Sequence, residues 1–145
     1  MILFTSATEE QRKRVRRTSF VYLWITLFCV LFGTVYEQFS HGIYSGFMLY
    51  AFAFPLVGGL LPFALLARQA NGWFPGRLAL HLHHCGIATL TVGSIVCGVL
   101  EIYGTENDWT QLYWIVGFGL VLAGIVVYVF ELLGSPGSST AAGGE

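Results

Sequence analysis

The chain has 145 residues, of which 55% are hydrophobic and 10% are charged, and its formal net charge is −1. Soluble domains carry roughly 25% charged residues, so this composition excludes an ordinary water-soluble fold and indicates a lipid bilayer as the solvent. Because the chain has only seven Lys and Arg residues, and their positions are explained by membrane topology as described below, we expect no nucleic-acid partner.

The first 17 residues form a basic segment that we expect to face the cytoplasm, with residues 1–10 disordered. Its cationic side chains could bind anionic lipid headgroups, at about 1 kcal/mol per residue. These candidates are Arg12, Lys13, Arg14, Arg16 and Arg17. The apolar run that follows is longer than the core of a signal peptide and lacks a small-x-small cleavage site, so an uncleaved first helix is favoured.

Four apolar runs are long enough to cross the bilayer, since about 20 helical residues span roughly 30 Å of hydrocarbon. They cover residues 18–39, 46–67, 85–103 and 111–133. The sequence therefore predicts an all-α, polytopic membrane protein with four transmembrane helices in two antiparallel hairpins. Residues 18–133 form one transmembrane domain, and the Gly- and Ser-rich tail 134–145 is predicted to be disordered.

The basic residues outside the N-terminal segment, Arg68 and Arg77, both lie between the second and third runs. By the positive-inside rule, that connection and both chain ends face the cytoplasm. The sequence thus predicts a multi-pass plasma-membrane protein, with residues 68–84 as an inward loop and with outward loops at 40–45 and 104–110.

The second run contains residues that interrupt helices: Pro55, Gly58, Gly59 and Pro62. A proline removes one backbone hydrogen bond and clashes with the preceding turn, so we expect a kinked packing helix. The alternative is a broken helix whose exposed carbonyl groups lie beside a substrate.

Small residues are frequent in the third and fourth runs. Helices in lipid associate where small residues let their backbones approach, so these two runs are predicted to pack tightly against each other. The glycines concerned are Gly86, Gly93, Gly98, Gly117, Gly119 and Gly124.

A candidate ligand or ion site lies at the outward side, where acidic and aromatic residues collect. It comprises Tyr36, Glu37, His41, Glu101 and Tyr103. Glu37 and His41 are four residues apart and, with Glu101, could bind Zn²⁺ or Mn²⁺. The alternative is that these are ordinary interfacial polar groups.

A second candidate metal site lies at the inward side, where His81, His84 and Cys85 follow an i, i+3, i+4 spacing on one helical face. Histidines that simply tolerate the membrane interface are the alternative. A haem held by two histidines across the bilayer is excluded, because His41 lies about 25–30 Å from the inward histidines. No cofactor is predicted.

Two stretches, 36–59 and 86–105, resemble a family of small four-helix integral membrane proteins of Gram-positive bacteria with no assigned activity. The resemblance implies no substrate or cofactor. It implies a recurring pattern that includes Tyr36, Glu37, Ser45, Pro55, Glu101, Tyr103 and Gly104.

No motif in the chain identifies a reaction, so enzymatic activity is not predicted. We expect a non-enzymatic accessory or partner subunit of a membrane complex, whose neighbours are the lipid bilayer and either a second copy or another membrane protein. One alternative is a small oligomeric transporter or channel for a cation or small solute. A second alternative is a metal- or haem-binding redox protein.

Overall fold

A computed structural model describes residues 2–39, 42, 45–68, 74–105 and 107–134. Its elements are α1 (Ile2–Phe39), α2 (Gly46–Leu49), the π-helix η1 (Phe54–Leu60), α3 (Leu61–Arg68), α4 (Arg77–Ile102) and α5 (Thr110–Leu133). The described part of the chain contains no strand, so the all-α prediction is confirmed there.

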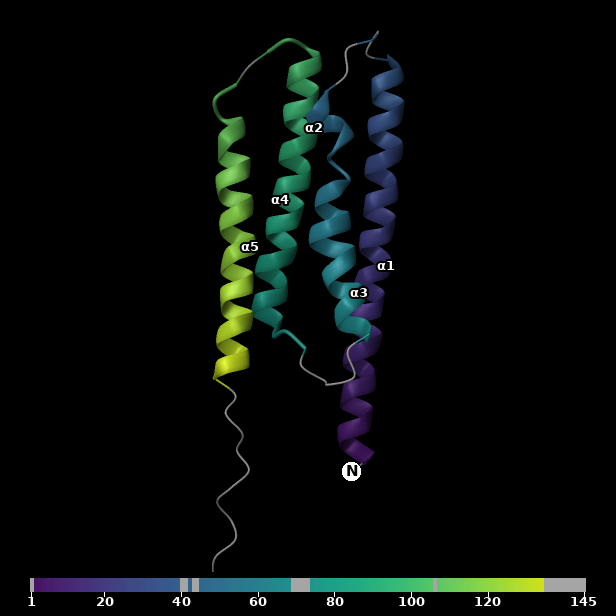
Figure 1. Ribbon diagram of the computed structural model, residues 1–145, viewed down its shortest axis with the longest axis vertical. Coiled ribbons are helices and arrows are strands. Elements are labelled where there is room, and N and C mark those ends of the chain that lie inside the picture. The colour runs from purple at the N-terminus through teal and green to yellow at the C-terminus, as the bar shows by residue number, and fades with distance from the viewer. Residues whose placement is uncertain (1, 40–41, 43–44, 69–73, 106, 135–145) are drawn as a thin grey trace, which may run out of the picture.

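Within the described ranges, four helical segments are long and apolar enough to cross a membrane. They are Glu9–Phe39, Gly46–Arg68, Arg77–Ile102 and Thr110–Leu133. The beginning of α1, the end of α3, the beginning of α4 and the end of α5 lie at the same end of the molecule (Figure 1). The seven basic residues therefore gather at that end, because each lies near the beginning of α1, the end of α3 or the beginning of α4.

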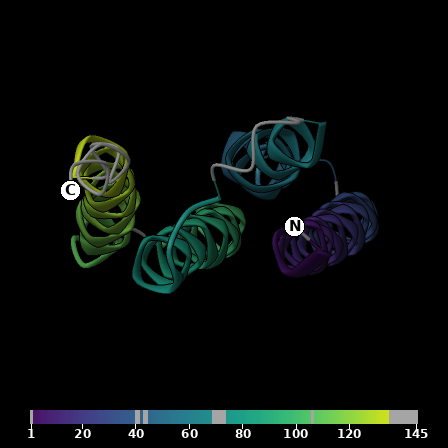
Figure 2. The same cartoon turned by 90° about the horizontal axis from the view of Figure 1, so that it is seen from below.

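The helices form an open row instead of a closed bundle (Figure 2). α5 packs on α4, α4 packs on α2 and η1, and α2, η1 and α3 pack on α1. Between the described parts of α1 and α5 there is no backbone contact. Each outer helix therefore keeps much of its apolar surface exposed.

α1 buries one narrow face against the second apolar segment. The buried residues are Val15, Tyr22, Thr26, Cys29 and Gly33, whose spacing repeats every three or four residues, as one face of a helix requires. The disorder predicted for residues 1–10 is wrong for the described residues 2–10, since α1 begins at Ile2. Residues 2–20 contain no Gly or Pro, so nothing in this stretch opposes continuation of the helix.

The second apolar segment departs from α-helical geometry where the sequence predicts a kink. α2 is followed by turns at residues 50–52, and η1 then includes Pro55, Gly58 and Gly59. Pro62 lies in the first turn of α3, where its missing N–H is tolerated. The segment is thus a short helix, a turn, a wide π-helix and a second α-helix in succession.

α4 and α5 approach closely at glycines. A Cβ atom added to Gly86 would lie 2.7 Å from the backbone nitrogen of Val121, and one added to Gly124 would lie 2.9 Å from that of His83. Gly98 instead faces Met48 of α2. Gly119 was also expected to face the third run, but no described atom lies within 4 Å of an added Cβ there.

α4 begins at Arg77, eight residues before the predicted third span. Residues 77–84 are therefore helical, which corrects the inward loop predicted for 68–84. The Gly76 N–H donates to Oε2 of Glu131, at 2.7 Å, so α5 supplies the acceptor for the chain entering α4. Cys85 is exposed, because α4 turns the face carrying His84 toward α1 instead.

Candidate functional site

A cluster of aromatic and imidazole rings joins α1, α3 and α4 near the end of the molecule that carries the basic residues. The hydroxyl oxygen of Tyr22 lies 2.6 Å from Nδ1 of His84. Phe63 stacks on both rings, with centroid distances of 5.7 Å to Tyr22 and 5.1 Å to His84. Tyr22 is 6% exposed and Phe63 is 3% exposed, so this ring cluster is part of the core that holds the three helices together.

The Tyr22 hydroxyl can both donate and accept, so its hydrogen bond with Nδ1 of His84 forms with either tautomer of that ring. In His83, the neighbouring residue, the hydrogen-bond partner fixes the proton position. Its Nε2 lies 2.6 Å from the Gly58 carbonyl oxygen, and because a carbonyl only accepts, Nε2 must donate.

The contact between His83 and Gly58 explains how the irregular second segment is accommodated. In an α-helix the Gly58 carbonyl would accept the N–H of residue 62, but Pro62 has none. The imidazole of α4 therefore gives the Gly58 carbonyl a donor that Pro62 cannot supply. A backbone acceptor buried in hydrocarbon without a partner would cost several kcal/mol, so this contact stabilises the break in the helix.

The two glycines of η1 let the neighbouring helices come close. A Cβ atom on Gly59 would overlap the ring of Tyr22, and one on Gly58 would overlap the side chain of Ile87. Because these two residues lack side chains, α1 and α4 both pack close to η1. These glycines were predicted as kink residues, and the structure also gives them a packing role.

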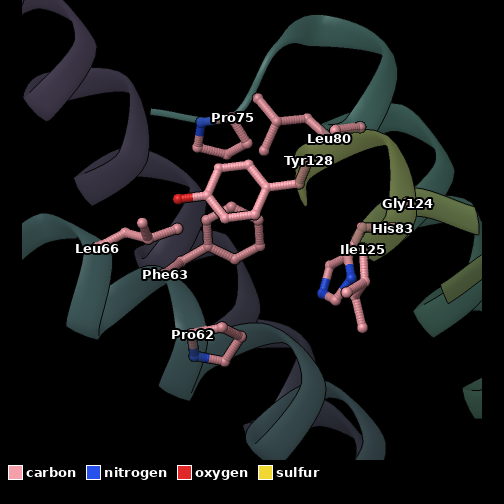
Figure 3. Close-up of a pocket in the computed structure, with 10 residues that line it drawn as sticks. Pro62, Phe63, Leu66, Pro75, Leu80, His83, Gly124, Ile125 and Tyr128 are labelled. Carbon is pink, nitrogen blue, oxygen red and sulfur yellow. The ribbon is translucent and has the colours of Figure 1, made fainter. Parts of the chain in front are cut away.

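A small cavity of about 140 Å³ adjoins this ring cluster. Figure 3 shows His83 and Ile125 on one side of it and Pro62 and Phe63 on the other, with Tyr128 above. Its walls are almost entirely apolar, and the Nε2 atom of His83 is already engaged by Gly58. This cavity therefore offers mainly apolar packing space beside the ring cluster.

The inward metal candidates do not assemble into a ligand set. His84 is directed to Tyr22, whereas His81 and Cys85 are exposed. Throughout the described residues, no three His, Cys, Asp or Glu side chains are grouped so that they could hold a metal. His81, His84 and Cys85 do have the i, i+3, i+4 spacing in α4, but His84 is hydrogen-bonded to Tyr22 of α1.

The outward candidates are brought together in part. Ser45, which is fully buried, donates from Oγ to Oε2 of Glu101 at 2.5 Å, and the phenol groups of Tyr36 and Tyr103 contact each other. Glu37 is partly buried near the end of α1. His41 lies outside the described residues, so the metal set that requires it stays a prediction.

The basic candidates all lie on the described part of α1, and the side chains of Arg12, Lys13, Arg14, Arg16 and Arg17 are exposed. Sequence reasoning missed three residues of the ring cluster, namely Tyr22, Phe63 and His83. A signal for one of them was present, since Pro62 cannot donate to a carbonyl of the preceding turn, where a donor from another helix such as His83 can take its place.

No protein-family model, curated protein or solved structure matches the chain. The resemblance to a four-helix family of Gram-positive bacteria therefore stays a prediction.

Proposed function

We propose that this protein is a multi-pass protein of a bacterial plasma membrane that acts, without enzymatic chemistry, as an accessory or partner subunit of a membrane complex. Its four apolar segments cross the bilayer as two antiparallel hairpins. The end that carries all seven basic residues faces the cytoplasm, as the positive-inside rule requires, and both chain ends lie on that side.

The observation that supports a subunit role is the open row of helices. Within the described residues the backbone of α5 lies against that of α4 alone, although Trp114 of α5 also meets the rings of Phe47 and Phe54. Large apolar side chains cover the outer faces of α5, with Ile115 70% and Phe130 69% exposed. A row of this kind encloses no lumen of its own. It presents two broad faces and an outer edge to lipid or to another protein.

A small-residue motif on α5 favours another protein as the neighbour at that edge. Gly119 is exposed and meets no described atom that a Cβ would touch, and Ala123 follows it by four residues. Small residues four apart on a lipid-facing helix are where a second helix can approach most closely. Gly119 itself meets no described neighbour within the row.

The two alternative functions have less support. A transporter that used the broken second segment would need an accessible carbonyl group, but the Gly58 carbonyl is occupied by His83. A metal-dependent redox function would need converging ligands, and the described residues supply no such group.

The proposal is tested by placing a photo-crosslinking amino acid, one position at a time, along the Gly119 face of α5. Ile115, Leu122 and Val126 share that face, and the exposed Trp24 of α1 serves as the control. In native membranes we expect one discrete protein adduct from the three α5 positions and none from Trp24. Gly119→Leu should abolish that adduct by blocking close approach.

Two results would contradict the proposal. One is the absence of any protein adduct from α5, or an equal adduct from Trp24, which would indicate lipid surroundings or random collisions. The other is an adduct made only of two copies of this 16.0 kDa chain. That result would replace the accessory role with a homo-oligomer.

A further inference from the structure

We propose that the groove between α1 and α4 binds one anionic phospholipid of the cytoplasmic leaflet, with its phosphate at the arginines and an acyl chain along the apolar part. This inference rests on the membrane placement proposed above but not on the subunit role, so each can fail independently.

The groove exists because α1 and α4 are bridged by side chains and not by backbone packing. In the described residues their backbones make no direct contact, and the Tyr22–His84 hydrogen bond spans the gap. Two cavities follow one another along the two helices, and both are lined by Thr18 and His84. We call these two cavities together the α1–α4 groove.

The cytoplasmic part of the groove is positively charged. A cavity of about 310 Å³ is lined by Arg14 and Arg77 together with the polar rings of His81 and His84. Arg17 lines the adjoining cavity. No acidic residue of the described chain lines either cavity. Guanidinium groups match phosphate oxygens in both charge and geometry, so this part suits a phosphate monoester or diester.

The other part of the groove is apolar and points toward the middle of the bilayer. This cavity has a volume of about 560 Å³, and beyond Tyr22 and His84 its walls include Val21, Ile25 and Val92. From Arg14 to Ile25 the helical rise is about 16 Å, which carries the groove from headgroup depth into the hydrocarbon. A soluble anion would use only the charged part, whereas an anionic phospholipid uses both.

The arginines divide into two sets by their position around α1. Arg14 and Arg17 line the groove, together with Thr18. Arg12 and Arg16 line neither cavity and, at 100° per residue, lie on nearly the opposite side of the helix from Arg14. These two pairs provide matched variants, because each removes two charges from the same exposed helix.

The test uses the purified full-length protein in detergent, with native mass spectrometry to count bound lipids. Equal amounts of phosphatidylglycerol and phosphatidylcholine with the same acyl chains are offered. We expect one phosphatidylglycerol to be retained in preference. R14Q/R17Q should weaken that binding about tenfold or more, since each cation near a lipid phosphate contributes about 1 kcal/mol. R12Q/R16Q removes two charges that lie outside the groove and should weaken it several-fold less than R14Q/R17Q does.

A second pair of variants tests the apolar part. Ala88 lines it and is exposed, so A88W should fill the groove and weaken phosphatidylglycerol binding while leaving the arginines in place. V129W adds the same ring at an exposed position of α5 that lines neither cavity, and should have no effect. Glycerol 3-phosphate, which has no acyl chain, should not displace the lipid.

Three results would overturn the inference. The first is a wild-type protein with no preference for the anionic lipid. The second is an equal loss in R14Q/R17Q and R12Q/R16Q, which would reduce the effect to general surface charge. The third is displacement by glycerol 3-phosphate or full binding in A88W, either of which would remove the apolar part of the site.

Discussion

His83→Phe tests whether an imidazole replaces the backbone donor that Pro62 lacks. Phenylalanine keeps an aromatic ring beside Phe63, which His83 meets edge-on at 5.9 Å between ring centroids, but removes the N–H that donates to Gly58. The variant therefore separates the hydrogen bond from the packing of the ring.

The expected loss of stability follows from the Gly58 carbonyl, which loses its imidazole donor in this variant. Interhelical hydrogen bonds in membrane proteins contribute about 0.6 kcal/mol on average and about 1.7 kcal/mol at most, and a buried acceptor without a partner costs about 1–3 kcal/mol. Because Pro62 cannot supply a substitute donor, we expect the upper part of the first range, about 1.5 kcal/mol. His83→Gln, which keeps an N–H donor, should lose less than half of that free energy of unfolding.

A double-mutant cycle with Pro62→Ala gives the decisive comparison. Alanine restores an N–H four residues after Gly58, so in that background His83→Phe should cost less than about 0.5 kcal/mol, a coupling of about 1 kcal/mol. The measurement is unfolding in mixed detergent micelles, followed by far-ultraviolet circular dichroism. An equal cost of His83→Phe with proline and with alanine at position 62 would refute the replacement of one donor by the other.

Three further substitutions test the packing described above. Gly117→Ala should destabilise the protein by about 1–3 kcal/mol through overpacking at the α4–α5 contact. Gly119 has open space around it, so Gly119→Ala should be neutral or stabilising by up to about 1 kcal/mol. Similar thermal unfolding of the two variants would contradict this expectation. Ser45→Ala should cost about 1–2 kcal/mol because it removes both the hydrogen bond to Glu101 and the cap of α2, and Glu101→Gln, which keeps an acceptor, should unfold nearer to wild type in the same assay. Tyr22→Phe keeps the ring stack and loses one hydrogen bond, so a loss of about 1 kcal/mol is expected, and unchanged stability would mean that the hydroxyl contributes nothing.

The number and extent of the apolar segments could be predicted from the sequence because length and hydropathy are local properties. The helix ends were harder to predict. Polar residues such as His81 and His84 were expected in a loop, yet α4 begins at Arg77, since nothing between Gly76 and His84 breaks a helix. Local polarity therefore did not indicate where the helix began.

The candidate site was less predictable, because it depends on which helix faces which. The break in the second segment was predicted from Pro55 and Pro62, but the donor that satisfies it comes from α4, 25 residues beyond Gly58. Likewise, the spacing of His84 and Cys85 indicated a shared face but not that Tyr22 of α1 would occupy the first of them. Only the tertiary arrangement assigns these partners.

The open row has a consequence for how the chain assembles and comes apart. Since each described helix after α1 packs on those made before it, the architecture can be completed in the order of synthesis, and the Gly58 carbonyl and the Gly76 N–H receive their partners from later helices. For the same reason α5 can detach from α4 while the ring cluster stays intact. Its amides should then exchange with deuterium by a local opening of lower free energy than global unfolding, which makes the last helix the most easily released piece of the protein.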